Sequence, residues 1–397
     1  MTAFSIPAAA LEPLAAADSL NRRVRATRTE PAEDPRFEAL ALAVTANLPV
    51  LLWGEPGIGK SAAVERLATG LRVPLETVIP GVNGPSDVAG LPVIGDDPTR
   101  FGVSMAPPDW ALRLADAGCG LVFFDEPSLA PPAVQAALLR VVLERRVGGL
   151  ALPEPVRVVA AADPASGAAL SPPLANRFVH LRWAHDPRTL ARGLAGTWPS
   201  PRVPLIDPDK VPGAVARARG AVSGFLSARP DLSHRLPGDA DGRGAAWPSP
   251  RTWEMVLRLL TAAHATGTGG EALAMAVTGA VGDGAGTELL SYLDRLDLPD
   301  PDRVLAHPDA FPPPARGDHL IAFLTAVVAA VHDDLTRERW EAGWTVLAKA
   351  VDTGVPDAAA QAAADLAALR NPDWAVPGGI DAFLDLLRLV GALPGGR

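Results

Sequence analysis

The stretch LLWGEPGIGKSAAVERL, residues 51–67, constrains the fold of this 397-residue chain more than any other feature. Within it, Gly54, Gly59, Lys60 and Ser61 match the pattern G-x-x-x-x-G-K-[ST] of a phosphate-binding loop. Glycines at these positions let backbone N–H groups turn inward around a polyphosphate, and the helix that follows adds the positive end of its dipole. The pattern therefore predicts a strand, a phosphate-binding loop and a helix, in that order.

The sequence on either side of the loop supports this interpretation. Residues 49–53 form a short apolar run that indicates a buried strand, and residues 61–71 repeat apolar side chains along one helical face. Lys60 is one of only three lysines among the 36 basic residues of the chain. A lysine is a compact charge on a flexible stem, so the planar fork of an arginine would not be a conservative replacement. The alternative is a glycine-rich turn that matches by chance.

The loop also predicts how a nucleotide would be held. Lys60 would reach the β- and γ-phosphates, and Ser61 would be a ligand of Mg²⁺. The residues expected to line the nucleotide here are Gly54, Pro56, Gly57, Gly59, Lys60, Ser61 and Ala62.

Two acidic residues follow an apolar run further along the chain. Residues 121–126 read LVFFDE, and four apolar residues in a row indicate a central strand of a parallel sheet, buried on both faces. Carboxylates at its carboxyl end would lie where open α/β sheets bind ligands. Asp125 would hold Mg²⁺, directly or through water, and Glu126 would act as general base for the attacking water. The alternative is an acidic helix start, with Pro127 opening the next helix.

Three later segments extend the pattern. Residues 156–162, VRVVAAA, predict another strand, which ends at Asp163 and Pro164. The run LANRF follows at 174–178, and PSPRTW at 248–253 predicts the start of a helix.

Together these segments resemble an AAA+ ATPase, most closely the MoxR group, whose relatives include magnesium chelatase and midasin. The resemblance covers roughly residues 35–265 and rests on GEPGIGKS at 54–61, SDVAGLPV at 86–93, LVFFDEPSLAPPAVQAALLRVVLERRV at 121–147 and LPEPVRVVAAADP at 152–164. It implies a P-loop AAA+ fold of the α/β class, in which a parallel sheet flanked by helices is followed by an all-α lid and a C-terminal helical region. It also implies ATP and Mg²⁺ as cofactors.

The resemblance assigns roles to two arginines. Arg177, in LANRF, matches the arginine finger, which reaches the γ-phosphate bound by the neighbouring subunit. Arg251, in PSPRTW, matches the second sensor, which the helical lid carries over the nucleotide. Either could instead be one of the many surface arginines of this chain. A finger supplied to a neighbour has meaning only in an oligomer, so the resemblance implies a homo-oligomer: a hexameric ring, which could require nucleotide to form.

Asp163 departs from the family's pattern. Relatives usually carry asparagine at this first sensor, and its amide can donate a hydrogen bond to the γ-phosphate or orient the water. An ionised aspartate has no hydrogen to donate, so we expect slow basal hydrolysis from a catalytic set of Glu126, Asp163 and Arg177. In the alternative interpretation Asp163 is tuned to this site, paired with an arginine such as Arg251.

Two segments predict β-hairpins. Residues 91–105 have a polar tip at 96–100, and residues 145–158 contain Gly148 and Gly149 between apolar runs. They resemble the insert in the second helix and the hairpin before the first sensor, which in relatives face the centre of the ring and contact partners or substrate. The alternative is that both hairpins only close the fold.

The expected organisation has four parts: an N-terminal segment (1–34), the nucleotide-binding domain (35–186), a helical lid (187–298) and a C-terminal helical bundle (299–397). Residues 229–250 are expected to form a long loop before the second-sensor helix, and the proline-rich residues 299–317 a linker. Apolar spacings predict four bundle helices, at 320–335, 337–351, 357–369 and 380–390. The spacing of Trp340 and Trp344, one turn apart, favours core packing over a ligand box.

Composition narrows the function. The net charge of −9 disfavours a general nucleic-acid-binding surface. The single cysteine, Cys119, excludes an intrachain disulfide framework and is expected to be a small buried residue. No basic region followed by an apolar stretch opens the chain, and the longest strongly apolar run, residues 320–331, is too short to span a membrane. A cytoplasmic location is the simplest expectation.

These features favour an ATP-hydrolysing remodeller or chaperone that acts on a protein partner, as MoxR relatives commonly do with von Willebrand A-domain proteins. Two alternatives remain open. One is a nucleotide-dependent switch or scaffold that binds ATP with little hydrolysis, which Asp163 favours. The other is a DNA-acting motor, which the acidic charge and the lack of a basic, aromatic strip oppose.

Overall fold

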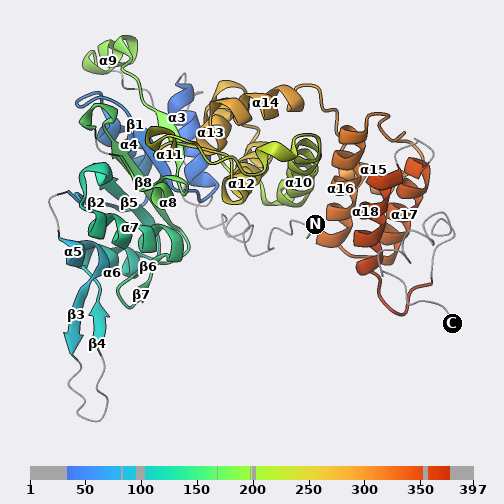
Figure 1. Ribbon diagram of the computed structural model, residues 1–397, viewed down its shortest axis with the longest axis horizontal. Coiled ribbons are helices and arrows are strands. Elements are labelled where there is room, and N and C mark those ends of the chain that lie inside the picture. The colour runs from blue at the N-terminus through green and yellow to red at the C-terminus, as the bar shows by residue number, and fades with distance from the viewer. Residues whose placement is uncertain are drawn as a thin grey trace. The chain divides into compact units, whose positions relative to one another are not determined.

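The computed structural model describes residues 34–81, 84–94, 103–167, 169–196, 198, 203–351 and 356–375 (Figure 1). The chain forms two compact units, Met1–Pro208 with His234–Thr287 and Asp209–Ser233 with Glu288–Arg397. Each unit has a hydrophobic core of its own.

A five-stranded parallel sheet lies at the centre of the first unit. In the spatial order β2-β5-β8-β1-β9, its strands are Leu75–Val78, Gly120–Asp125, Val156–Ala162, Val50–Trp53 and Val179–Arg182. Every neighbouring pair is parallel, so the chain must cross over between strands. The predicted α/β class, a parallel sheet flanked by helices with a helical region after it, is confirmed.

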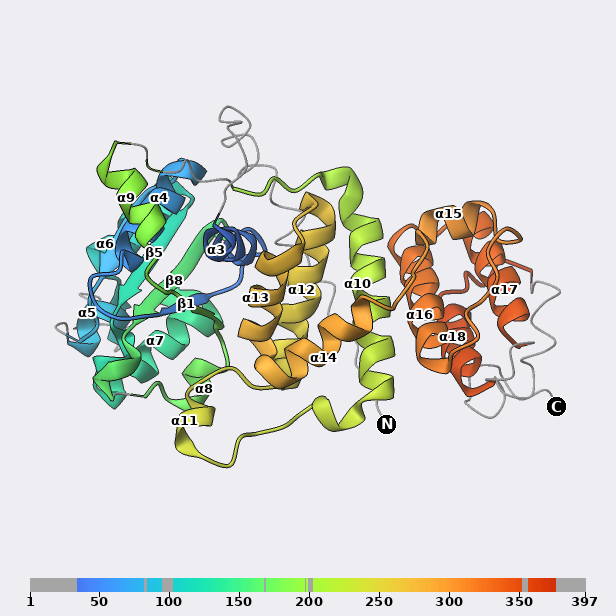
Figure 2. The same ribbon diagram turned by 90° about the horizontal axis from the view of Figure 1, so that it is seen from above.

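In the part of the first unit that the structure describes, ten helices surround the sheet or follow it in sequence (Figure 2). They are α3 (Pro35–Thr45), α4 (Lys60–Leu71), α5 (Pro85–Ala89), α6 (Asp109–Ala117), α7 (Pro132–Glu144), α8 (Pro172–Ala175), α9 (Pro187–Leu194), α11 (Ala240–Arg243), α12 (Pro250–Thr266) and α13 (Gly270–Val281). Most begin with a proline, which suits the first turn because the N–H groups there have no partner within the helix. The side chain of Asp34 caps α3 by accepting a hydrogen bond from the N–H of Arg36.

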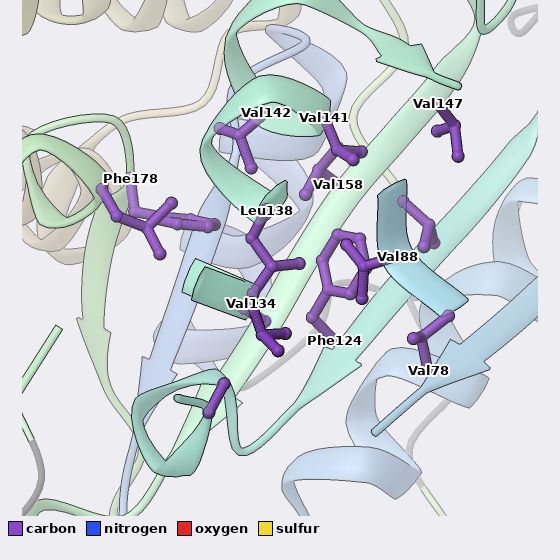
Figure 3. Packing of buried hydrophobic residues seen from close by; sticks show 14 of the residues in the cluster. Val78, Val88, Phe124, Val134, Leu138, Val141, Val142, Val147, Val158 and Phe178 are labelled. Atoms are coloured by element: carbon purple, nitrogen blue, oxygen red, sulfur yellow. The ribbon is translucent and has the colours of Figure 1, made fainter. Parts of the chain in front are cut away.

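The core of the first unit lies between the sheet and helix α7. Figure 3 shows Leu138 and Val141 of α7 beside Phe124 of β5 and Val158 of β8. Strand β8 is buried along its whole length, and β5 along all but its last residue. The apolar run before Asp125 therefore forms the buried central strand that it predicts.

Both predicted hairpins form. Strand β3 (Leu91–Ile94) pairs antiparallel with β4 (Val103–Ala106), and the expected polar tip at 96–100 lies outside the described residues. Strands β6 (Arg146–Val147) and β7 (Leu150–Ala151) pair around Gly148 and Gly149. Cys119 is buried, as predicted.

The second unit is helical. Its helices are α10 (Val211–Ala228), α15 (Pro301–Ala306), α16 (Gly317–Asp333), α17 (Arg337–Val351) and α18 (Pro356–Ala368), and α14 (Asp283–Leu293) continues into it from the first unit along the chain. Trp340 and Trp344 are buried, with their rings 6.1 Å apart at 82°. The indole N–H of Trp340 donates to the carbonyl of Leu366 at 2.8 Å. Core packing of the two tryptophans is confirmed, and the fourth expected helix, 380–390, lies outside the described residues.

The linker expected at 299–317 is wrong in part. Residues Pro301–Ala306 form α15, whose first turn is capped by the side chain of Asp300. Val304 and Leu305 are buried in the core of the second unit. The prolines around this helix suggest a linker, but one of them occupies the helix start, where proline is favoured.

The two units do not follow the expected boundaries after residues 186 and 298. The region expected to form one lid is divided, because Asp209–Ser233 belongs to the second unit and His234–Thr287 to the first. The long loop expected at 229–250 contains a 3₁₀ turn, Pro230–Leu232, and the short helix α11. Among the described residues, no helix is both long enough and apolar enough to cross a membrane.

Candidate functional site

The phosphate-loop motif has the geometry of an open cradle. The loop begins after β1 and ends where α4 starts at Lys60. Gly57 and Gly59 have φ angles of 77° and 93°, the left-handed conformation that glycine adopts most easily. A Cβ atom at either position would meet nothing within 4 Å, so space is open beside the backbone there. At Gly54, in contrast, a Cβ atom would lie 2.3 Å from the carbonyl oxygen of Trp183.

Lys60 is buried under this loop, with 7% of its surface exposed. Its Nζ donates to the carbonyl of Gly54 at 2.6 Å and to that of Glu55 at 3.1 Å. The charge is thus held at the loop by two carbonyl oxygens. Ser61 and Ala62, in the first turn of α4, are exposed, as is Pro56 in the loop.

The two acidic residues lie at the carboxyl end of β5, where Asp125 is the last residue of the strand and Glu126 follows it. Burial raises the pKa of Asp125, and the charge of Lys60 opposes that rise, which means that these two groups are close enough to interact. Glu126 has a φ of 54°, an uncommon conformation for a residue with a side chain. Backbone strain of this kind clusters at functional sites.

Backbone hydrogen bonds tie the carboxyl ends of three strands together. The N–H of Gly54 donates to the carbonyl of Ala162 at 3.1 Å, and the N–H of Glu126 to that of Ala161 at 2.8 Å. The N–H of Asp163 donates to Oε2 of Glu126 at 3.1 Å. The structure therefore brings the phosphate loop, Asp125, Glu126 and Asp163 to one edge of the sheet, because parallel strands end at a common edge.

The side chain of Asp163 is used locally. Its Oδ1 accepts a hydrogen bond from the N–H of Ala165 at 2.8 Å and caps the 3₁₀ turn Pro164–Ser166. Arg251 instead donates to Oδ1 of Asn176 at 3.2 Å. The alternative pairing of Asp163 with Arg251 is therefore not what this chain adopts.

Arg177 and Arg251 lie near each other, at the opposite edge of the sheet. Arg177 precedes β9, whose first residue Val179 is in register with Val50, the first residue of β1. The phosphate loop follows the other end of β1, and a four-residue strand spans about 13 Å. Figure 2 shows α8, which leads to Arg177, at the end of the sheet opposite to α4. Burial, and next the charge of Arg251, lower the pKa of Arg177.

Arg251 is held in place through a buried amide, and its role as second sensor stays a prediction. Asn176, which is 2% exposed, accepts hydrogen bonds from Arg251 and, at 2.9 Å, from the hydroxyl of Ser249. Ser249 in turn caps α12 by accepting from the N–H of Thr252. Asn176 and Ser249 were not expected at the site from sequence, although both belong to the runs LANRF and PSPRTW that contain the two arginines.

A pocket of about 250 Å³ adjoins the strand that leads into the phosphate loop. Its lining includes Arg36, Trp53, His180, Arg182, Met275 and Gly279. The indole N–H of Trp53 donates to Nδ1 of His180 at 2.9 Å, so Nε2 carries the hydrogen and donates to the carbonyl of Ala175 at 2.8 Å. Burial lowers the pKa of His180 to about 4, and the ring is therefore neutral at pH 7. Sequence reasoning missed this residue because the histidines are scattered along the chain.

No protein-family model matches the sequence, and no curated protein matches it. Among solved structures, one match is the crystal structure of a provisionally named ATPase from Cytophaga hutchinsonii. The two sequences are 16% identical, the match covers 63% of this chain and 78% of that chain, and the TM-score is 0.38. A TM-score of this size does not establish a common fold, so the fold class rests on the strand order and the crossovers.

Proposed function

We propose that this chain is an ATP hydrolase of the AAA+ type, similar to the MoxR group. The observation that carries the proposal is the convergence of a buried lysine, an open glycine loop and two carboxylates at one edge of a parallel sheet. Lys60 donates a hydrogen bond to a carbonyl of the loop, and its charge acts on the pKa of Asp125. The carboxylate of Glu126 accepts a hydrogen bond from the backbone N–H that follows β8.

The residues present suit a triphosphate with Mg²⁺. The open backbone at Gly57 and Gly59 leaves room for phosphate oxygens, and Lys60 can turn from the loop carbonyls to those oxygens. Ser61 and Asp125 would hold the cation, which would neutralise phosphate charge as it does in other phosphoryl-transfer enzymes. Glu126 would orient a water molecule and take its proton.

The pocket beside Trp53 is our candidate for the base of the nucleotide. Its volume of about 250 Å³ lies below the ~300–1,000 Å³ of sites that enclose a whole drug-sized ligand. It could hold one part of a ligand, and Trp53 directly precedes the phosphate loop. Aromatic and apolar side chains such as Trp53 and Met275 suit the faces of a purine.

We further propose that the arginines act between subunits. Arg177 and Arg251 lie at the edge of the sheet opposite to the phosphate loop of their own chain, so the phosphates they could serve belong to a neighbour. That arrangement supports a homo-oligomeric ring, with six subunits as in the family that the sequence resembles. Two guanidinium groups held near each other suit a polyanion, and Arg251 is bonded to the neutral amide of Asn176 rather than to a carboxylate.

The activity that hydrolysis would drive is the remodelling or assembly of a protein partner, such as a von Willebrand A-domain protein. The hairpin of β3 and β4 supports contact with a partner. Ile94 and Val103 face each other across its strands and are 79% and 67% exposed. Apolar side chains gathered on a projecting ribbon are typical of an interaction surface.

A single substitution tests hydrolysis. Glu126→Gln should keep ATP binding but lower steady-state turnover by about 10²-fold or more, because general-base catalysis is removed. Glu144→Gln, which changes an exposed glutamate paired with Arg140, is the matched control and should retain turnover. A parent protein that hydrolyses no ATP with Mg²⁺, or a Glu126→Gln protein with full turnover, would contradict the proposal.

The same variant tests the partner. Glu126→Gln should trap ATP and retain in a pull-down those proteins that the parent releases. Adding DNA to the ATPase assay tests the motor alternative, because a DNA-acting motor would be stimulated and a protein remodeller would not.

One observation favours a second candidate, a switch that binds ATP and hydrolyses it slowly. The carboxylate of Asp163 is committed to the N–H of Ala165, and when ionised it has no hydrogen to offer a phosphate or a water molecule. ATP binding without measurable turnover in the parent protein would support the switch.

A further inference from the structure

Two hydrogen bonds to Asp163 hold the turn that follows β8. Oδ1 of Asp163 accepts from the N–H of Ala165 at 2.8 Å, and the hydroxyl of Ser166 donates to the carbonyl of Asp163 at 2.8 Å. Both bonds fold the turn back onto Asp163. Asp163 and the turn are therefore held together by their own hydrogen bonds.

The backbone conformation of Asp163 is also restricted. Its φ and ψ are −97° and 119°, the extended conformation to which a following proline restricts a residue. In this conformation its N–H points at Oε2 of Glu126, 3.1 Å away. The cap on one side of Asp163 and the hydrogen bond on the other thus depend on a single backbone geometry.

Glu126 is held through both its backbone N–H and its side-chain carboxylate. Its own N–H is bonded to the carbonyl of Ala161 at 2.8 Å, and its carboxylate accepts from Asp163. The bond from Asp163 thereby fixes Oε2 of this carboxylate. A general base must be held within hydrogen-bonding reach of the proton that it takes, and a misplacement of about 1 Å can lower a rate about 10²-fold.

We propose that Asp163 is a positioning residue for Glu126. By capping the turn Pro164–Ser166, it aims its own backbone N–H at the carboxylate of the general base. This inference rests on the proposed hydrolase function. It gives Asp163 a task that needs a hydrogen-bond acceptor, which an ionised aspartate supplies although it has no hydrogen to donate.

The two roles predict different orders of activity among three variants. A cap can be made by Asp, Asn or Ser but not by Ala. Asp163→Ala should therefore lower kcat by about tenfold or more, with KM for ATP changed by less than about twofold because the phosphate loop is untouched. Asp163→Ser should recover most of that loss, and Asp163→Asn should recover it without exceeding the parent. A weakened sensor predicts instead that Asp163→Asn exceeds the parent by one or two orders of magnitude.

Hydrogen exchange resolved to single amides tests the contact without any turnover. Asp163→Ala should speed exchange at the amides of residues 163 and 165, and Asp163→Ser should slow both again. Glu126→Ala should speed exchange at residue 163 alone, whereas Glu126→Gln, which keeps an acceptor oxygen, should protect that amide. Circular dichroism and the melting temperature check that each variant is folded.

The outcomes separate the two proposals. If the parent hydrolyses no ATP, the proposed function fails, and the exchange data still decide whether the Asp163 cap aims its N–H at Glu126. If the parent hydrolyses ATP but Asp163→Ala retains its kcat, or Glu126→Ala leaves exchange at residue 163 unchanged, the positioning role is wrong while the hydrolase stands. An Asp163→Asn protein at least tenfold faster than the parent would also overturn the positioning role.

Discussion

Lys60 carries a positive charge that the fold keeps almost entirely out of water. Burying an ammonium group is costly unless it is hydrogen-bonded, and here two carbonyls of the phosphate loop supply those bonds. The same two bonds hold the loop around the position that a phosphate would take. To bind a phosphate, Lys60 would exchange these two carbonyl acceptors for phosphate oxygens, so its charge would stay hydrogen-bonded in both states.

Lys60→Ala should therefore weaken ATP binding by about 100-fold or more, because a charge-assisted hydrogen bond contributes about 1.5–3 kcal/mol and Lys60 can make several. Titration calorimetry measures this loss, and circular dichroism shows that the fold is retained. Lys349→Ala is the matched control, since Lys349 also donates to a backbone carbonyl, that of Pro308 at 3.1 Å. Parent-like ATP affinity in Lys60→Ala would rule out the phosphate-loop interpretation.

His180 makes the stability of the first unit depend on pH. Its pKa falls from 6.5 to about 4 in the folded protein, so between these values the unfolded chain binds more protons than the folded one. Stability is therefore full above pH 6.5 and is lost as the pH falls toward 4, by up to about 3 kcal/mol. The decrease in melting temperature between pH 7 and pH 4.5 should be smaller for His180→Gln than for the parent. Replacing the exposed His307 with Gln should leave the parent's pH dependence intact, and equal dependence in all three proteins would contradict this account.

At the scale of elements, the phosphate loop joins β1 to α4 and also touches the end of β9. Gly54→Ala would push a Cβ atom against the carbonyl of Trp183, at 2.3 Å, and overpacking of this kind costs about 1–3 kcal/mol. Gly57→Ala would meet no neighbour within 4 Å, so its only cost would be the left-handed conformation, about 1–2 kcal/mol. Gly54→Ala should therefore lower the melting temperature of the first unit more than Gly57→Ala. The reverse order would show that the loop does not pack on β9 as described.

The elements that the sequence predicted well are those encoded by local patterns. The apolar runs before Gly54 and Asp125 define β1 and β5, because a buried strand needs only a few consecutive apolar residues. The cap at Asp163 is also local, since an aspartate before a proline and two small residues is a typical turn signal. The same residue also stands at the first-sensor position of the family that the sequence resembles, so the local pattern alone does not decide between a cap and a sensor.

Other features depend on contacts between distant parts of the chain. Arg251 lies beside Asn176, 75 residues away in sequence, and no periodicity predicts that α12 presents it there rather than over the phosphate loop. The bond between Trp53 and His180 likewise spans 127 residues. Such placements follow from how whole helices pack against the sheet, which sequence patterns do not encode residue by residue.

At the scale of the whole molecule, the two edges of the sheet carry different chemistry. The carboxyl edge holds the phosphate loop and the acidic pair, and the amino edge holds Arg177 and Arg251. If the proposed roles are right, the phosphate site of one chain lacks the two arginines, and its arginines have no phosphate of their own chain within reach. Head-to-tail contact between copies would bring one edge to the other, and repetition of that contact closes a ring when the rotation per subunit fits.

Arg177→Ala should accordingly leave ATP affinity nearly unchanged, because the phosphate loop of the same chain is intact. It should lower turnover by up to about 10³-fold if the arginine acts as fingers do elsewhere. Mixing Arg177→Ala with Glu126→Gln should restore part of the activity, since a Glu126→Gln subunit can lend its intact Arg177 to the intact base of its neighbour. Subunits that carry both changes cannot lend an arginine and are the control. Native mass spectrometry should first establish that mixed rings form; if they do and no mixing ratio restores turnover, Arg177 does not act between subunits.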